Sequence, residues 1–161
     1  MNRTRIAGLG CVLIVLAIAV AGLLHRDAQE VPADLVLLHD GEQIELSLED
    51  LQQTSFSGET VNGKGEHFTH DYEGVALYDL LADNGIAPED VSEAEVRAAD
   101  QYAATVTGEE ICEQDRIYLA VTEDGEPVEG IDEGTPGIEM VVFGDSDSKR
   151  CVRCVVEIEM K

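Results

Sequence analysis

The sequence has few aromatic residues and few basic ones. Of its 161 residues only 4% are aromatic and none is tryptophan, so its hydrophobic core must be built mainly from aliphatic side chains. The same scarcity argues against the aromatic platforms on which proteins stack single-stranded nucleic acid. Ten basic residues stand against 34 acidic ones, and the formal net charge is -24. This charge repels phosphate backbones, so the sequence predicts no nucleic-acid partner and favours a cationic protein.

Acidic residues are also absent from the first 26 positions, which have the pattern of a membrane-directed leader. Arg3 and Arg5 precede an uncharged run from Ile6 to Leu24, which as a helix would extend about 28 Å, close to the thickness of the hydrocarbon core of a bilayer. Basic residues on that side favour a cytoplasmic N-terminus. Residues 19–21 offer a small-residue cleavage site. Residues 1–26 are therefore predicted to be a signal peptide or a membrane anchor, which makes the protein secreted or cell-membrane anchored and extracytoplasmic.

Residues 27–33 are predicted to be a linker, and residues 34–161 to be one domain of many short strands. Leu77, Leu80 and Leu81 recur at helical spacing before Asn84-Gly85, which predicts one short helix that ends at the glycine. Strands in runs with few helices predict a compact, mostly-β domain of the α+β class. The expected strands are 35–38, 43–46, 54–61, 66–72, 96–99, 102–106, 117–121, 138–143 and 152–160.

Local turn signals support several of these elements. The segments 39–42 and 62–65 contain Asp-Gly and Asn-Gly pairs, which are typical of tight β-hairpins. Ser47 begins the phrase S-L-E-D, in which its hydroxyl and the Asp50 carboxylate can cap a short helix.

Histidine and cysteine are the residue types that suggest a metal or redox site. His67 and His70 lie near Glu66 and Asp71, but residues three apart on a strand point to opposite faces. No second cluster completes a metal site, so no metal ligand is assigned, and both histidines are expected on the surface or lining a pocket.

Three cysteines follow the leader: Cys112, Cys151 and Cys154. An oxidising compartment favours a disulfide between Cys112 and one of the other two. Cys151 and Cys154 have the spacing of a redox dithiol or a zinc knuckle, but such a dithiol usually opens a helix, whereas this pair enters a predicted strand. A thiol-based redox protein is therefore the weaker alternative.

Lys149, Arg150 and Arg153 form the one basic cluster of the sequence. Two interpretations remain open from the residues alone. The cluster could bind an anionic ligand, or it could neutralise the neighbouring acidic loops.

Several phrases together resemble the molybdopterin-binding domain of the sulfite-oxidase-type oxidoreductases. Residues 74–81, with Gly85, are similar to the family's segment G-V-P-L-x-D-L-L…G, and residues 100–102 to its D-G-Y turn. Residues 119–120 and 124–128 are similar to L-A…N/D-G-E-P-L, and residues 137–144 to G-P-x-R-L-V-V-P-G. Val152-Arg153 with Ile158-Glu159 is similar to the closing V-K…I-E. These matches follow the family's order across residues 34–161.

The resemblance implies molybdopterin as the cofactor and places its pocket near six residues: Ser57, His67, His70, Asp100, Tyr102 and Arg153. Two departures bear on activity. Family enzymes hold molybdenum through a cysteine on the strand before the helix, whereas the segment 54–72 has no cysteine and Ser57 lies near that position. Serine oxygen is a poorer match to that soft thiolate position. Glu139 also replaces a basic residue that lies near the anionic cofactor.

These departures lead to a hypothesis with alternatives. The chain is predicted to be a non-catalytic ligand-binding or accessory module of an extracytoplasmic redox system, with no catalytic residue assigned. Its partners would be an exported redox protein or a cationic protein, and the membrane if the leader is retained. The alternatives are a true molybdenum-cofactor oxidoreductase with an atypical ligand and an acidic interaction domain.

Overall fold

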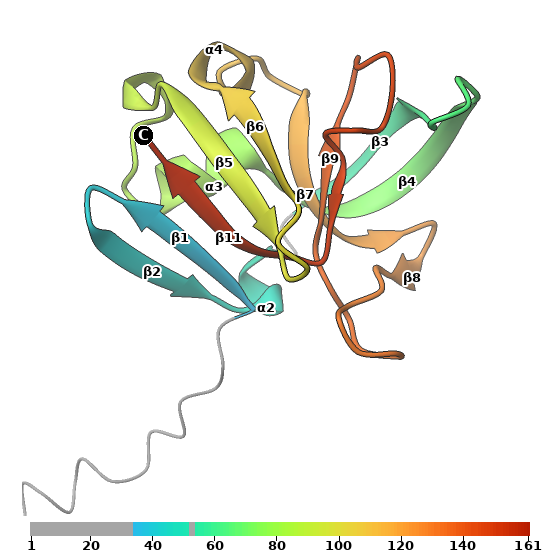
Figure 1. Cartoon of the computed structure of the whole chain (residues 1–161), viewed down its shortest axis with the longest axis horizontal. Helices are drawn as coiled ribbons and strands as arrows, with labels where there is room; N and C mark the ends of the chain where they lie inside the picture. Colours follow the sequence, from blue (N-terminus) through green and yellow to red (C-terminus); the bar gives the residue numbers. More distant parts are fainter. Residues whose placement is uncertain (1–33, 52–53) are drawn as a thin grey trace, which may run out of the picture. The chain divides into compact units, whose positions relative to one another are not determined.

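Two β-sheets make up most of the part of the chain that the computed structural model describes, residues 34–51 and 54–161 (Figure 1). These residues belong to one compact unit. The predicted leader and linker lie outside the described residues. Within the described ranges, no helix is long and apolar enough to cross a membrane.

The first sheet, sheet A, has five strands in the order β2-β1-β11-β5-β6. β1 pairs with β11 in parallel, and the other neighbours are antiparallel. Its strands are β1 (Leu35–His39), β2 (Glu42–Leu46), β5 (Glu93–Ala98), β6 (Ala103–Thr107) and β11 (Val155–Met160).

The second sheet, sheet B, is antiparallel and has the order β10-β9-β7-β4-β3, with the short strand β8 paired to β7. Its strands are β3 (Thr54–Val61), β4 (His67–Ala76), β7 (Ile117–Glu123), β8 (Glu126–Pro127), β9 (Glu139–Val142) and β10 (Val152–Arg153). The helical elements are α2 (Leu48–Leu51), α3 (Leu77–Asp83), the 3-10 turn η1 (Pro88–Asp90) and α4 (Gly108–Ile111).

The local predictions of turns and helix ends are confirmed. Asp40 and Gly41 have φ values of 51° and 81° at the β1–β2 turn, as the twist of a tight hairpin requires. The Asp50 carboxylate accepts hydrogen bonds from the backbone N–H and the hydroxyl of Ser47, each at 2.8 Å, at the start of α2. Gly85 has a φ of 79° just after α3, in the left-handed conformation that ends a helix.

The predicted closing strand 152–160 is wrong in one respect, because the structure breaks it at Cys154. Cys154 has a φ of 53°, and it separates β10 in sheet B from β11 in sheet A. Val152 and Val155 are both buried although they are three positions apart, which a continuous strand with a period of two does not allow. The left-handed residue resets the alternation and carries the chain from one sheet to the other.

The main core lies between the sheets and is entirely aliphatic, as the composition predicts. Leu35 and Val96 of sheet A, Leu119 and Met140 of sheet B, and Leu80 of α3 all belong to it and have no exposed surface. The architecture is the predicted mostly-β α+β class. The residues that the resemblance singled out lie on sheet B and at one turn of sheet A.

Candidate functional site

Sheet B carries a second hydrophobic cluster on the face turned away from the main core. Leu119 of β7 faces the main core, so its neighbour Tyr118 faces the other way. The ring of Tyr118 stacks on the ring of Phe56 of β3, with the two ring centroids 3.9 Å apart. The ring of Phe56 also stacks on that of Tyr72 of β4, with a centroid distance of 5.3 Å. The ring centroid of Phe143, just after β9, lies 5.8 Å from that of Tyr118. Four of the seven aromatic residues of the chain therefore gather here.

The β3–β4 hairpin beside this cluster presents two faces, and the predicted site residues are divided between them. Ser57 pairs with Asp71 and Val61 with His67, which places Ser57 and His67 on one face. His70 lies on the other face, with Tyr72. The prediction that the two histidines point to opposite faces is confirmed.

A cavity of about 290 Å³ lies between the hairpin and the β9–β10 segment. Its lining includes both His70 and Arg153. The His70 Nδ1 atom is 2.8 Å from Asp124 Oδ2 and 3.5 Å from Glu123 Oε1, and the Arg153 Nε atom is 3.4 Å from Glu139 Oε2. The lining residues are Thr60, Val61, Asn62, Phe68, His70, Tyr72, Glu123, Glu139, Val141, Ser148, Cys151 and Arg153.

The electrostatics of this cavity are dominated by a buried carboxyl group. The Glu139 side chain is only 12% exposed, whereas its partner Arg153 is 72% exposed. Burial raises the pKa of Glu139, although the Arg153 charge acts in the opposite direction. Burial and the charge of Glu123 also raise the pKa of Tyr72. The cavity therefore disfavours additional negative charge.

Ser57 and His67 border a different space, a groove of about 650 Å³ on the β3 side of the hairpin. His67 Nδ1 lies 2.8 Å from Glu59 Oε1 there. A Cβ atom on Gly58 would lie 2.4 Å from the Phe143 ring, so only glycine lets β3 approach that ring. The groove is lined by Ser57, Gly58, Glu59, Val61, Gly65, His67, Asp115, Phe143, Gly144, Asp145 and Ser146.

Asp100 and Tyr102 lie in sheet A, at the turn between β5 and β6, and line neither of these spaces. The Asp100 carboxylate accepts a hydrogen bond from the Tyr102 N–H at 2.9 Å, and the Tyr102 hydroxyl donates to the Lys149 carbonyl oxygen. Gln101 between them has a φ of 73°. In the structure these two residues stabilise a turn and link it to the β9–β10 segment.

All three cysteines of the described part are free thiols, so the predicted disulfide between Cys112 and one of the other two is absent from the structure. Cys112 is exposed at the end of α4, where no partner thiol reaches it. Burial raises the pKa of Cys151, which keeps this thiol protonated. The Cys154 Sγ atom instead donates to the Glu129 carbonyl oxygen at 3.6 Å, in a separate pocket. This placement gives no support to a redox dithiol.

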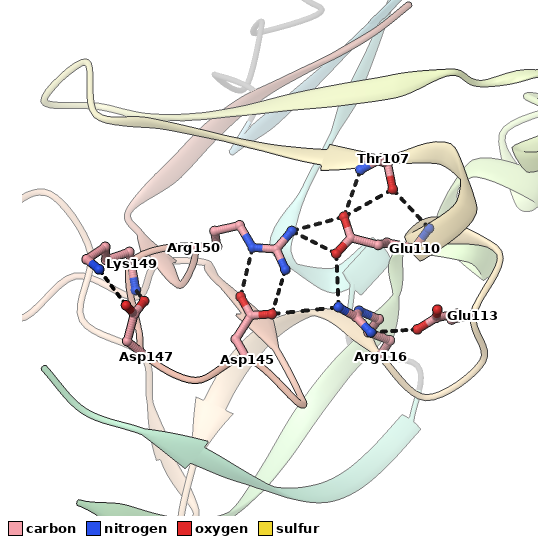
Figure 2. Close-up of polar contacts among 8 residues, drawn as sticks. All are labelled: Thr107, Glu110, Glu113, Arg116, Asp145, Asp147, Lys149 and Arg150. Atoms are coloured by element: carbon pink, nitrogen blue, oxygen red, sulfur yellow. Dashed lines mark hydrogen bonds and ion pairs between the residues drawn. The ribbon is translucent and has the colours of Figure 1, made fainter. Parts of the chain in front are cut away.

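The basic cluster is used for neutralising acidic loops. Arg150 donates two hydrogen bonds to the Asp145 carboxylate, at 2.8 and 2.5 Å, and one to Glu110 at 2.9 Å (Figure 2). Lys149 pairs with Asp147 at 2.5 Å. Of the two interpretations of this cluster, the structure therefore supports the counter-charge.

Sequence reasoning missed the other half of this network. Arg116 donates to Glu113 at 2.7 Å and to Glu110 at 2.9 Å, and it lies 3.7 Å from Asp145 (Figure 2). The one local signal was the pair Thr107 and Glu110, which forms a capping box at α4. Burial acts to raise the pKa of Glu110, but the Thr107 N–H and Arg150 outweigh it and hold this pKa below its usual value.

The described residues do not fit molybdopterin. Ser57, near the expected metal position, and Arg153, which the resemblance places in the same pocket, border different cavities. Arg153 already pairs with Glu139, whose burial would oppose an anionic group. Apart from this cofactor, no group of three or more His, Cys, Asp or Glu side chains within 34–51 and 54–161 is arranged to hold a metal ion by itself.

The fold itself has a known counterpart. No family model matches the chain, and neither does any curated protein at the sequence level. Among solved structures, the chain is similar to the sulfane dehydrogenase SoxCD from Paracoccus pantotrophus, with a TM-score of 0.61 and 18% sequence identity. The match covers 78% of this chain but only 37% of the SoxCD chain, so this protein corresponds to about a third of that enzyme subunit. At this identity the likeness establishes a shared fold, in agreement with the sequence resemblance.

Proposed function

We propose that this protein is a non-catalytic accessory module that keeps the fold of a molybdopterin-binding domain without the cofactor chemistry. The proposal includes its export and its association with an extracytoplasmic redox system. The structural similarity to SoxCD, a sulfane dehydrogenase, supports the redox context. The pattern of residues 1–26 supports export.

The separation of Ser57 from Arg153 is the observation that carries the proposal. Molybdopterin bound as the resemblance implies needs Ser57 and Arg153 in one pocket, but here the two residues border different cavities that have only Val61 in common. The cavity that does contain Arg153 also contains Glu139 and Glu123, so its charge is opposite to that needed for a phosphate.

The experiment is to produce the full chain in a host that loads a control molybdenum enzyme. Bound molybdenum would be measured by elemental analysis and released pterin by fluorescence, on the same sample. We expect neither in the purified protein. Stoichiometric molybdenum and pterin would overturn the proposal and favour an oxidoreductase with an atypical ligand.

Two variants sharpen this measurement. Ser57→Cys supplies the missing thiolate, and Ser57→Cys with Glu139→Arg also supplies the missing basic residue. We expect both to remain without cofactor, because the substitutions do not bring positions 57 and 153 into one cavity. Loading of the double variant would show that two residues, and not the arrangement of the cavities, exclude the cofactor.

A further inference from the structure

Among the described residues, 34–51 and 54–161, no strand pairs with the outer side of β3, the last strand of sheet B. β3 pairs with β4 on its other side over residues 54–61 without a register shift. The Asn62 N–H donates to the Glu66 carbonyl oxygen at 3.0 Å, so this pair is hydrogen-bonded across the hairpin. Along an antiparallel ladder, hydrogen-bonded residue pairs alternate with pairs that are not hydrogen-bonded. Because Asn62 is in a hydrogen-bonded pair, the backbone N–H and C=O groups of Ser57, Glu59 and Val61 point away from β4.

The groove described above runs along this same side. Ser57, Glu59 and Val61 of β3 line it together with Phe143 to Ser146, the segment that follows β9. From Ser57 to Val61 the strand extends about 13 Å, enough to pair with a short added strand. Its volume of about 650 Å³ provides room for the backbone and small side chains of such a segment.

β3 also lacks the usual protection of an edge strand. Natural proteins block such edges with lysine, proline or a bulge. β3 reads TSFSGETV, with neither residue type, and Glu59 is its one charged side chain. The edge strand β2 of sheet A, EQIEL, also has neither lysine nor proline, but it carries two charged side chains, Glu42 and Glu45.

We propose that the free edge of β3 is a docking site for an extended, cationic segment of a partner protein, which would add a strand to sheet B. Glu59 and Asp115 border the groove and favour positive charge in the segment, whereas the Asp145 carboxylate beside them is already paired with Arg150. A second copy of this chain would bring the same excess of acidic residues and would be repelled. The inference depends on the proposed accessory role in one respect, which is that a partner protein exists.

Synthetic peptides test the site without altering the protein. The probe is a capped heptapeptide that alternates lysine and valine, and the readout is hydrogen exchange of individual amides in the full chain. We expect the peptide to protect the amides of Ser57, Glu59 and Val61. Methylating the backbone nitrogens of every second peptide residue removes the ladder hydrogen bonds and should weaken binding about tenfold or more. The same peptide with glutamate in place of lysine should not bind.

A pair of protein variants tests the charge contribution. Glu59→Lys reverses one charge in the groove, and Glu42→Lys makes the same change on the β2 edge. We expect Glu59→Lys to weaken binding of the lysine peptide about fivefold, and Glu42→Lys to change it less than about twofold.

Three outcomes would overturn the proposal. The first is the absence of β3 protection at saturating peptide, and the second is equal affinity for the methylated peptide, which would mean attraction by charge alone. The third is a dimer with protected β3 amides before any peptide is added, which would identify a second copy as the occupant. Cofactor loading combined with β3 protection would overturn the accessory role and leave the docking site standing.

Discussion

The two hydrophobic clusters of this protein differ in composition and in burial. The main core between the sheets has only aliphatic side chains, and Leu80, Leu119 and Met140 have no exposed surface. The second cluster on sheet B packs Tyr72 with three aliphatic residues, and Phe56 and Phe143 at its margin are only partly buried. The first cluster holds the two sheets together. The second borders the cavity through Tyr72 and Val141 and the groove through Phe143.

The largest expected effect is in the aliphatic core. Leu119→Ala removes a fully buried side chain and should lower the free energy of unfolding by about 3 kcal/mol, through lost burial and the cavity that remains. Chemical denaturation measures this loss. The control is Ile131→Ala, because Ile131 is 67% exposed and its change should stay within about 0.5 kcal/mol. Similar losses for both variants would contradict the division into a core and a surface.

A substitution in the arginine network beside the groove should have the second-largest effect on the free energy of unfolding. Asp145→Asn removes the charged partner of Arg150, and the Asp145 side chain is 14% exposed. We expect a loss of about 2 kcal/mol in unfolding free energy, because two partly buried arginines lose their shared carboxylate. Asp147→Asn is the matched control, since its partner Lys149 is 82% exposed. The loss of unfolding free energy in Asp147→Asn should be much smaller than in Asp145→Asn. Equal losses in the two variants would mean that burial does not matter to this network.

The contact between β3 and the aromatic cluster should have a smaller effect. Gly58→Ala places a methyl group against the Phe143 ring and should cost about 1 kcal/mol through overpacking. In a double-mutant cycle, Phe143→Leu should recover part of this loss. Gly63→Ala is the control, since its Cβ would meet nothing within 4 Å. Additive effects of the substitutions at positions 58 and 143 would show that the two residues do not touch.

The smallest effect concerns the pH dependence of stability. Burial raises the pKa of Glu139 in the folded protein above its ordinary value of 4.5. The folded state therefore binds this proton more tightly than the unfolded state, and stability falls as pH rises from about 4.5 through the raised pKa. Glu139→Gln removes this dependence, so the stability of the variant relative to the wild type should increase over that interval.

Unfolding free energies measured at a series of pH values check this expectation. Glu126→Gln serves as the control, because Glu126 is exposed on β8 and its replacement removes the same charge. The increase with pH in stability relative to the wild type should be larger for Glu139→Gln than for Glu126→Gln. A relative stability of Glu139→Gln that falls with rising pH would mean that the charge of Arg153 outweighs burial and lowers the pKa of Glu139.

Much of the fold was predictable from the sequence, because its signals are local. The Asp-Gly turn between β1 and β2, the cap formed by Ser47 and Asp50, and the stop of α3 at Gly85 each depend on residues a few positions apart. The break at Cys154 was not predictable from alternation alone. A left-handed residue there is stabilised by contacts with distant parts of the chain, such as the hydrogen bond from the Ala99 N–H to the Cys154 carbonyl oxygen.

The candidate site was predictable only in part, for the same reason. The period of a strand placed His67 and His70 on opposite faces. The pairing of Arg150 with Glu110, 40 positions away, depends on how the strands are ordered. So does the division of Ser57 and Arg153 between two cavities.

The sequence by itself determined the aliphatic core, the hairpins and the helix ends, because composition and short-range hydrogen bonds set these features. The tertiary structure alone decided which distant side chains share a cavity, which charges neutralise one another and which strand lies at the edge of sheet B. These features follow from strand order and sheet curvature, which bring together residues that are far apart in the chain.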